Sequence, residues 1–400
     1  MFTQNANLFT KRKILPVLEK HLDSSEPIVL TGFRRVGKTT VVKYLFDNLK
    51  TDNKIFLDME SPINQRIFKK ENYESIVSDL TNLGLDIKTK AYVFIDEIQY
   101  SKKSPSIVKY LFDHYKIKFV LTGSSSFYLK NHFGESLSGR KFLFELFPLD
   151  FEEFLWFKGE KMSLDADYDL LRHLYDEYME FGGLPAVVLE NDIDNKRLRL
   201  DDALGSYFQL DVVNLTSFQE RKNLESLMFL LASRVGSKLD ITKLAQTLGV
   251  SRQTLYGYLE FLKETYLINL VPQYSNSSDV VVRKVQKLYF NDTGIANRVE
   301  KLSQGQIFEN TIFNQLYLKN YFNNLGQTLK PRVYYYQLKT GAEIDFITEG
   351  VGYEVKLSGS IYDVNRMERF SKKLDLVDSK VISLEKSNEE NNKIIYPFNL

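Results

Sequence analysis

The stretch Thr31–Thr40 reads TGFRRVGKTT, and its residues 32–39 fill every fixed position of the pattern G-x-x-x-x-G-K-[ST]. A short apolar run of strand type, Pro27–Leu30, precedes this stretch. Thr40–Leu49 follows it, with apolar residues repeated at helical spacing. Strand, glycine loop and helix come in the order that a phosphate-binding loop requires. The stretch therefore predicts an α/β domain with a parallel sheet that binds a nucleotide.

Each position of this loop has an expected role. Gly32 and Gly37 let backbone N–H groups and the positive end of the helix approach phosphates without a side chain in the way. Lys38 is expected to contact the β- and γ-phosphates, and the Thr39 hydroxyl to bind the accompanying magnesium ion. We predict ATP and Mg2+ as cofactors, and a tight turn without a ligand is the alternative. The predicted loop residues are Gly32, Phe33, Arg34, Arg35, Val36, Gly37, Lys38, Thr39 and Thr40.

Composition excludes several classes of protein. A chain of 400 residues predicts two or three domains, and a net charge of +1 indicates no overall attraction to nucleic acid. Cysteine is absent and the four histidines are scattered, which excludes disulfides and argues against a zinc site. There is neither an apolar signal segment nor a run of eighteen apolar residues. We therefore expect a soluble, cytoplasmic protein without a membrane partner.

A second chemical pattern follows the apolar strand Ala91–Ile95, which runs directly into Asp96 and Glu97. An apolar strand that ends in Asp-Glu is typical of the Walker B motif. Asp96 is expected to hold magnesium, and Glu97 to orient or deprotonate the attacking water. Two acidic residues at the start of a solvated loop are the alternative, which the complete phosphate loop upstream disfavours.

Two further residues are candidates for the same site. The predicted strand Ile117–Thr122 ends in a serine-rich turn, and the carboxyl ends of parallel strands line the ligand crevice. Ser124 is therefore a candidate to sense the γ-phosphate or position water, with a plain serine turn as the alternative. Arg140 precedes a strand-like run, Lys141–Leu149, and is a candidate arginine finger acting in cis or in trans. A surface ion pair is the competing interpretation of Arg140.

The combination of motifs resembles the bacterial and archaeal AAA-type ATPases that carry a C-terminal nuclease-like domain. The motifs that carry this resemblance are Gly32–Thr39, Ile95–Glu97, Thr122–Ser125, Ser138–Arg140 with Phe147–Leu149, and Gly182–Pro185. The last of these is similar to the glycine-x-proline motif of related signalling ATPases. That similarity implies that Pro185 lies against the adenine, and the helical segment that contains it is expected to form a lid over the nucleotide.

The middle of the chain predicts a helix-turn-helix. Asp240–Leu248 is an amphipathic helix capped by Asp240, and Gly249 closes it; Ser251 then caps a second helix, Arg252–Glu264. Val280–Val282 and Lys287–Phe290 are expected to supply the strands of a winged helix. Ser251, Arg252, Gln253 and Thr254 would then face DNA, with Arg283, Lys284 and Lys287 nearby. A spacer or a protein-binding element is the alternative.

The last third carries the D…E-x-K pattern of the restriction-endonuclease-like fold, written PD-(D/E)xK. Asp345 lies in one predicted strand, and Glu354 and Lys356 share one face of the next. Asp345 and Glu354, with Glu309 from the preceding helix, are the expected magnesium ligands, and Lys356 is the expected catalytic lysine. An exposed pair of salt-bridged strands is the alternative. Residues 305–400 are neutral, with 12 Lys+Arg and 12 Asp+Glu, so DNA affinity needs a local patch such as Arg366, Arg369, Lys372 and Lys373.

The predicted architecture has four segments: a P-loop ATPase core (1–150), a helical lid (151–222), a winged helix (223–300) and a nuclease-like α/β domain (301–400). The predicted function is an ATPase that couples its nucleotide state to the winged-helix and nuclease-like segments, acting on DNA. A slow nucleotide-dependent switch that binds DNA or protein and cuts nothing is the alternative. DNA and a second copy of the chain are the partners that this hypothesis suggests beside ATP.

Overall fold

The structure is a computed structural model that describes residues 10–101, 103–124, 139–160, 168–212, 218–275, 285–326, 332–338, 341–387 and 391–400. The chain divides into two compact units. The N-terminal unit contains the residues up to Phe147 together with Glu264–Tyr266, and the C-terminal unit contains Pro148–Lys263 and Leu267–Leu400. The first boundary lies close to the predicted end of the ATPase core at residue 150. The three predicted downstream segments belong to a single compact unit, because their helices and strands pack on one another.

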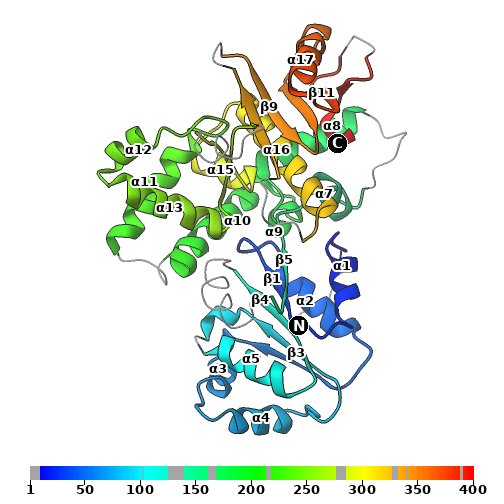
Figure 1. Cartoon of the computed structure of the whole chain (residues 1–400), viewed down its shortest axis with the longest axis vertical. Helices are drawn as coiled ribbons and strands as arrows, with labels where there is room; N and C mark the ends of the chain where they lie inside the picture. Colours follow the sequence, from blue (N-terminus) through cyan, green and yellow to red (C-terminus); the bar gives the residue numbers. More distant parts are fainter. Residues whose placement is uncertain are drawn as a thin grey trace. The chain divides into compact units, whose positions relative to one another are not determined.

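The N-terminal unit is built on a five-stranded parallel sheet of order β2-β3-β4-β1-β5 (Figure 1). Its strands are β1 (Ile28–Thr31), β2 (Lys54–Asp58), β3 (Ala91–Asp96), β4 (Ile117–Gly123) and β5 (Phe142–Glu145). Its helices are α1 (Leu15–His21), α2 (Lys38–Asn48), α3 (Pro62–Ile67), α4 (Tyr73–Asn82), the 3-10 turn η1 (Ile98–Tyr100) and α5 (Ser104–His114). The predicted P-loop parallel sheet is thus present.

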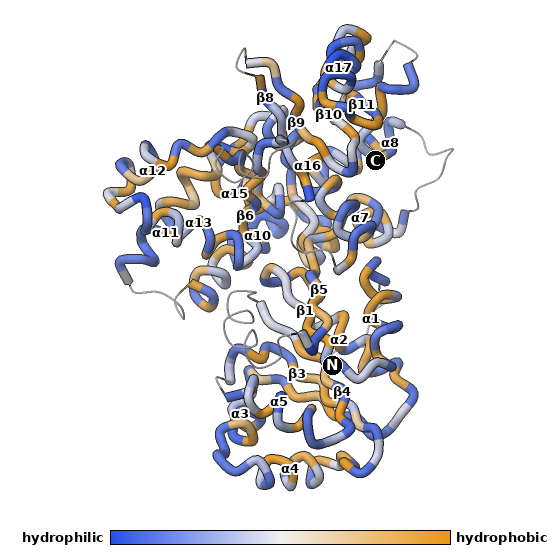
Figure 2. The backbone as a smooth tube through the Cα atoms, in the orientation of Figure 1, coloured by the Kyte–Doolittle hydropathy of each residue, from blue (hydrophilic) through white to orange (hydrophobic). Residues whose placement is uncertain are grey.

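Burial explains why these segments form parallel strands. Every residue of β1, β3 and β4 is buried, as expected for strands covered on both faces. Figure 2 shows β3 and β4 as largely hydrophobic. A parallel sheet directs all of its strand ends to one edge, so the residues that follow β1, β3 and β4 lie close together.

Helix α1 begins at Leu15, and Pro16 fixes its first turn. One predicted element of this unit is shorter in the structure. The strand expected over Lys141–Leu149 spans only Phe142–Glu145. Pro148 has no backbone N–H to donate to a neighbouring strand, and the chain passes into the C-terminal unit at this residue.

The first part of the C-terminal unit is helical. It contains α7 (Phe151–Phe157), α8 (Tyr168–Phe181), α9 (Pro185–Val188), α10 (Ile193–Ser206) and a π-helical turn, η2 (Tyr207–Val212). It continues with α11 (Phe218–Ala232), α12 (Ile241–Leu248) and α13 (Arg252–Glu264). The predicted helix-turn-helix is present as α12 and α13. Asp240 accepts a hydrogen bond from Lys243 N, Gly249 closes α12 at φ +67°, and Ser251 Oγ accepts from Thr254 N.

After α13 the strands β6 (Ile268–Val271) and β7 (Lys287–Phe290) form a two-stranded antiparallel sheet. The expected wing strand Val280–Val282 and the basic residues Arg283 and Lys284 lie outside the described residues. Ser125 and Ser138 of the N-terminal motifs also lie outside them. The assignment of this region as a winged helix therefore stays a prediction.

The last part of the C-terminal unit is a mixed five-stranded sheet of order β12-β11-β10-β9-β8. Its strands are β8 (Tyr334–Gln337), β9 (Glu343–Thr348), β10 (Val351–Lys356), β11 (Asp378–Ser383) and β12 (Ile394–Ile395). The helices α15 (Thr293–Val299) and α16 (Gln304–Asn323) precede it, α17 (Ile361–Leu374) lies between β10 and β11, and η3 (Pro397–Asn399) ends the chain. α17 packs on β10 and β11, and α16 packs on β9 and β10. This packing brings Glu309 of α16 to the strands that carry Asp345 and Glu354.

Candidate functional site

The phosphate-binding loop has a backbone that only glycine allows at its first position. Gly32 has φ +153°, and a Cβ placed there would lie 2.0 Å from the carbonyl oxygen of Leu146. Gly37 has φ +97° and begins α2. The Lys38 ammonium is buried and donates to the carbonyl oxygens of Gly32 and Phe33, each at 3.0 Å. The Lys38 side chain therefore folds back onto the backbone of its own phosphate-binding loop.

The two carboxylates at the end of β3 are held by the neighbouring strand β4. The Thr122 hydroxyl donates to Asp96 Oδ1, and its oxygen accepts a hydrogen bond from Glu97 N at 3.0 Å. The Thr39 hydroxyl also bonds to Asp96. Glu97 adopts φ +51°, an unusual conformation for a residue with a side chain. One threonine therefore positions both acidic residues.

The Glu97 carboxylate is already engaged by two donors. Ser124 Oγ donates to its two oxygens at 2.8 and 3.1 Å, and the Gln99 amide donates as well. Burial alone would raise the pKa of Glu97, but Lys38 and these donors outweigh burial and lower the pKa below its ordinary value. Ser124, predicted to contact phosphate or water, here contacts Glu97.

Negative charge gathers at this edge of the sheet. Burial raises the pKa of Asp96, although its bonds to Thr122 and Thr39 oppose the shift. Burial also raises the pKa of Glu60, with Glu97 and Asp58 adding to the effect. Such a carboxylate group attracts a cation, and a buried Asp96 beside a threonine hydroxyl fits the ligand chemistry of Mg2+. The site therefore fits the magnesium ion that accompanies a nucleotide.

Four residues of this site were not predicted in these roles: Asp58, Glu60, Gln99 and Thr122. Asp58 ends β2 in register with Asp96, and Thr122 lies near the end of β4. The rule that carboxyl ends of parallel strands meet at one edge was sufficient to find Asp58 and Thr122. Gln99 lies in the short 3-10 turn η1 and Glu60 in a turn after β2, and no sequence periodicity describes the course of such short segments.

Arg140 does not join this site. It precedes β5, whose first residue, Phe142, pairs with Ile28, the first residue of β1. The two strands are parallel, and the phosphate loop follows the carboxyl end of β1. Arg140 precedes β5 and therefore lies near the amino ends of the strands, away from the phosphate loop. The exposed Arg140 side chain donates to Asp113 Oδ1 at 3.0 Å. The surface ion pair is thus present, a role in cis has no geometric support, and a role in trans stays a prediction.

The Gly182–Pro185 segment belongs to the C-terminal unit, and there it forms a turn fastened by Asp292. The Asp292 carboxylate accepts from Gly183 N at 2.8 Å and from Ile295 N at 2.9 Å. A Cβ on Gly182, which has φ +74°, would lie 2.2 Å from Asp292 Oδ1. Packing thus explains both glycines of the motif. The contact of Pro185 with adenine stays a prediction.

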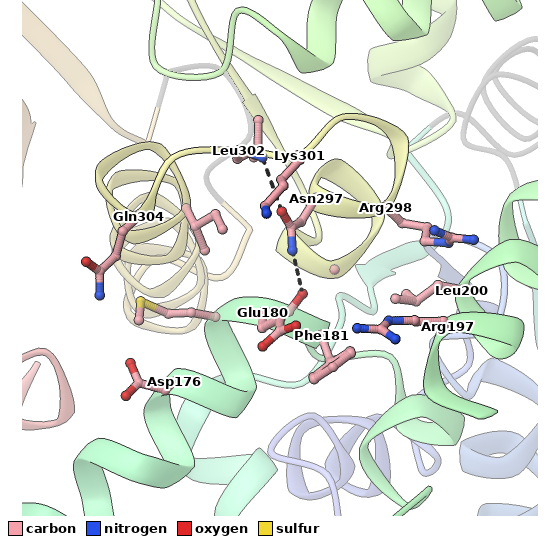
Figure 3. Close-up of a pocket in the computed structure, with 13 residues that line it drawn as sticks. Asp176, Glu180, Phe181, Arg197, Leu200, Asn297, Arg298, Lys301, Leu302 and Gln304 are labelled. Atoms are coloured by element: carbon pink, nitrogen blue, oxygen red, sulfur yellow. Dashed lines mark hydrogen bonds between the residues drawn. The ribbon is translucent and has the colours of Figure 1, made fainter. Parts of the chain in front are cut away.

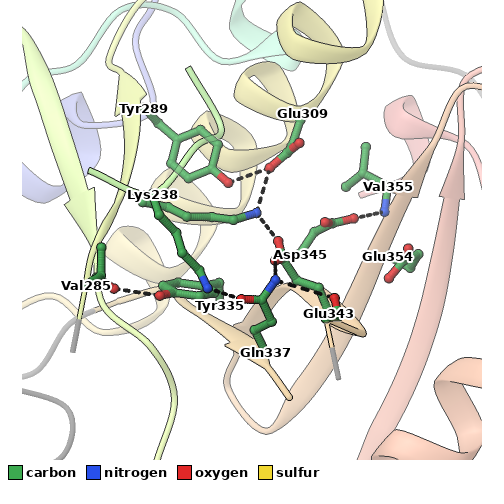
Figure 4. A network of polar contacts seen from close by, with 12 residues as sticks. Lys238, Val285, Tyr289, Glu309, Tyr335, Gln337, Glu343, Asp345, Glu354 and Val355 are labelled. Atoms are coloured by element: carbon green, nitrogen blue, oxygen red, sulfur yellow. Dashed lines mark hydrogen bonds and ion pairs between the residues drawn. The ribbon is translucent and has the colours of Figure 1, made fainter. Parts of the chain in front are cut away.

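The C-terminal carboxylates converge in part (Figure 4). Glu309 accepts from the Tyr289 hydroxyl at 2.6 Å and from Lys287 Nζ at 3.3 Å. Asp345 Oδ2 accepts from Val355 N at 2.8 Å. Burial, together with the charge of Asp345, raises the pKa of both Glu309 and Glu354 to about 7. The three predicted ligands therefore share one electrostatic environment.

Cationic side chains of the protein neutralise this cluster. Lys287 pairs with Glu309 and Glu343, and Glu354 Oε1 pairs with Arg366 and, at 2.7 Å, with Lys356. Within the described part of the chain, no group of three or more His, Cys, Asp or Glu side chains is placed to hold a metal ion. The predicted ligands do not fit a metal in this arrangement, because Lys287, Lys356 and Arg366 supply the positive charge instead. Of these interactions, sequence reasoning missed Lys287 with Glu309 and Arg366 with Glu354.

A separate cleft of about 570 Å3 lies in the C-terminal unit among α8, α10, α15 and α16 (Figure 3). Its lining is mixed, with Met179, Phe181 and Leu200 beside charged residues such as Arg298. Arg298 makes two hydrogen bonds of 2.7 Å to Asp201, which satisfies its charge. No predicted site residue lines this cleft.

Within the described residues, no helix is long and apolar enough to cross a membrane.

Comparison with known families agrees with the geometry of the N-terminal unit. Residues 24–155 match the family described as AAA domain. The five-stranded parallel sheet and the phosphate-binding loop lie within the matched residues. Two domains of unknown function, DUF8612 and DUF4143, match residues 172–306 and 304–400. The boundary between them lies close to the predicted start of the last segment at residue 301.

The chain is similar along most of its length to proteins without a known role. It is 29% identical over 375 residues to an uncharacterized protein of Methanocaldococcus jannaschii, covering 89% of this chain and 81% of the relative. An uncharacterized protein of Haemophilus influenzae is 25% identical over 333 residues, covering 80% and 81%.

Among solved structures, the Walker-type ATPase of Pyrococcus abyssi matches with a TM-score of 0.47 and 18% identity, covering 73% of this chain and 96% of that one. The ORC1 protein of Aeropyrum pernix, solved in complex with DNA, matches with a TM-score of 0.32 and 12% identity, covering 72% and 91%.

Proposed function

We propose that this protein binds ATP with Mg2+ at the AAA-type domain and hydrolyses it, and that its nucleotide state controls the C-terminal unit. One observation carries the proposal: Lys38, Thr39, Asp96 and Glu97 meet at a single edge of the parallel sheet. Lys38 would exchange its bonds to Gly32 and Phe33 for the β- and γ-phosphates. Thr39 and Asp96 would hold the magnesium ion, which supplies charge neutralisation when bound.

Glu97 is the proposed base for the attacking water. It is buried, it lies within the electrostatic range of Lys38, and Ser124 and Gln99 fix its orientation. General-base catalysis contributes about 100- to 10,000-fold to a rate. Glu97→Gln is therefore expected to keep ATP binding and to slow hydrolysis by about 100-fold or more, whereas Lys38→Ala is expected to abolish binding.

Steady-state phosphate release and titration with a fluorescent ATP analogue measure these two properties. An unchanged hydrolysis rate in both variants would contradict the proposed ATPase site. Asp47→Asn, which changes a charge on α2 outside the site, serves as the control for preparation effects.

A second candidate, a slow nucleotide-dependent switch, is favoured by the state of Glu97. Its pKa is lowered and two donors engage its carboxylate, both of which make it a weaker base. If this engagement limits turnover, Ser124→Ala is expected to raise the hydrolysis rate. If Ser124 instead positions the base, the same variant lowers the rate.

For the output of the C-terminal unit, we propose binding of nucleic acid without cleavage. The resemblance to PD-(D/E)xK nucleases suggests the ligand, and the neutralisation of Glu309, Asp345 and Glu354 by protein cations favours the non-cleaving alternative. The exposed residues Arg252 and Gln253 of α13 add a further candidate contact surface. Incubation of a supercoiled plasmid with Mg2+ or Mn2+, with and without ATP, is expected to leave it intact. Nicking that is lost in Asp345→Asn would show that the carboxylates do catalyse.

A further inference from the structure

Helix α17 carries a row of basic residues that begins with a tyrosine. Residues at positions i, i+4, i+7 and i+11 of a helix lie on one face, and in α17 these are Tyr362, Arg366, Arg369 and Lys373. Lys372 lies beside them. The opposite face packs on the sheet through Val364, Met367 and Phe370. Figure 2 shows both hydrophilic and hydrophobic residues along α17.

The charge of this face is positive and only partly neutralised. Within the described part of the chain, Arg369, Lys372 and Lys373 form no ion pair, whereas Arg366 is bound inward to Glu354. The two carboxylates of α17 are used elsewhere: Asp363 accepts from the Ser360 hydroxyl at 2.7 Å, and Glu368 pairs with Lys393 at 2.9 Å. Three cations are therefore left facing solvent within little more than one turn of the helix.

An exposed aromatic side chain begins the same face. Tyr362 is 67% exposed, and its apolar neighbours Ile361 and Leu357 are 40% and 37% exposed. From Tyr362 to Lys373 the helix rises about 16 Å, at about 1.5 Å per residue. An aromatic ring followed by a line of cations matches the way proteins hold single strands, in which bases stack on rings and cations follow the backbone.

We propose that this face of α17 binds a single strand of nucleic acid, with a base stacked on Tyr362 and phosphates along Arg369, Lys372 and Lys373. A single strand is specified because bases in a duplex are paired and stacked and cannot reach an exposed ring. The inference rests on the proposed nucleic-acid output of the C-terminal unit, and it is independent of ATP hydrolysis. It distinguishes this surface from α13, which was predicted to contact DNA.

The test is fluorescence anisotropy of the full-length chain without nucleotide and in the presence of a metal chelator. The probes are fluorescein-labelled dT20 and a 20-base-pair duplex. Wild type is expected to bind dT20 more tightly than the duplex. Tyr362→Ala is expected to weaken dT20 binding by about 5- to 150-fold, the range for loss of one stacked base, while Tyr362→Phe keeps it. Tyr256→Ala tests the competing surface on α13, where Tyr256 is 58% exposed, and is expected to leave dT20 binding unchanged.

The charge is tested separately by salt dependence. Arg369→Ala with Lys373→Ala is expected to reduce the slope of log K against log salt by about 1.4, at about 0.7 per phosphate contact on a single strand. Lys109→Ala with Lys116→Ala removes the same charge from exposed positions in the N-terminal unit and is expected to change the slope little. Circular dichroism of each variant checks that the fold is retained.

Each other outcome overturns the inference. Equal losses from both double variants would mean nonspecific attraction, and a loss in Tyr256→Ala without one in Tyr362→Ala would assign binding to α13. Tighter binding to the duplex, or binding to phosphatidylserine vesicles and not to dT20, would replace the proposed ligand. If wild type binds neither nucleic acid, the proposed output fails as well, while the ATPase proposal stands on its own assay.

Discussion

Thr122 links Asp96 and Glu97, the two carboxylates proposed to act in ATP hydrolysis, so Thr122→Val tests the proposed site directly. The Thr122 side chain is fully buried; its hydroxyl donates to Asp96 and accepts from Glu97 N at 3.0 Å. Valine has nearly the same shape but lacks both bonds. Loss of a hydrogen bond to a charged group costs about 1.5–3 kcal/mol, and an unpaired buried N–H costs about 1–3 kcal/mol. Because one hydroxyl makes both bonds, we expect a combined loss of about 2–4 kcal/mol in the unfolding free energy of the N-terminal unit.

The same substitution is expected to slow ATP hydrolysis. Without its bond to Thr122, Glu97 is no longer held at φ +51°, and its carboxylate moves relative to the attacking water. A displacement on the order of 1 Å at a reacting group costs about 100-fold in rate. We therefore expect kcat to fall by about 10- to 100-fold, with a smaller change in KM.

The neighbouring strand offers a matched control for stability. Thr31 is also fully buried, but its hydroxyl has no hydrogen-bond partner among the described residues. Thr31→Val should therefore change the unfolding free energy by less than about 1 kcal/mol, or stabilise the unit. Thr122→Ser keeps the hydroxyl and should retain most of the hydrolysis rate.

Urea unfolding followed by circular dichroism measures the loss. Trp156, the single tryptophan, lies in the C-terminal unit, so its fluorescence reports that unit separately and is expected to be unchanged. Equal effects of Thr31→Val and Thr122→Val on stability would refute the reasoning. So would a normal hydrolysis rate in Thr122→Val.

Three further predictions concern residues outside this pair. Arg140→Ala breaks only an exposed ion pair and should cost less than about 1 kcal/mol of stability. If Arg140 acts in trans, mixing the Arg140→Ala protein with the Lys38→Ala protein should restore some ATPase activity. No rescue in a proven oligomer would leave Arg140 a structural role. Millimolar Mg2+ should not raise the thermal stability of wild type through the C-terminal cluster, because Lys356 and Arg366 already neutralise Glu354. A stabilisation by Mg2+ that is absent in Asp345→Asn would contradict this account. Burial raises the pKa of Asp292 to about 6, so the folded state binds the proton more tightly than the unfolded state. The contribution of this group to stability therefore falls as pH rises from about 4 to 6. Asp292→Asn should remove about 2–3 kcal/mol of that pH dependence, measured by urea unfolding with Trp156 fluorescence, and an unchanged dependence would refute the assignment.

Local patterns were sufficient to predict four elements of the structure. The P-loop, the strand that ends in Asp96 and Glu97, and the capped helices α12 and α13 each depend on residues close together in the chain, and all four appear near their predicted bounds. The family match over residues 24–155 agrees with the first two. Propensity and capping act within a few residues, so they can be read from the sequence.

The pairings of side chains required the tertiary structure. Nothing in the sequence near Glu354 indicates that Arg366 binds it, or that Lys287 lies between Glu309 and Glu343. The same holds for Asp292, which fastens a turn 109 residues earlier in the chain. The sequence by itself determined which residues carry charge and which segments are strands and helices. The packing of distant segments decided which charge neutralises which, because electrostatic energy depends on distance and burial, and neither quantity is encoded locally.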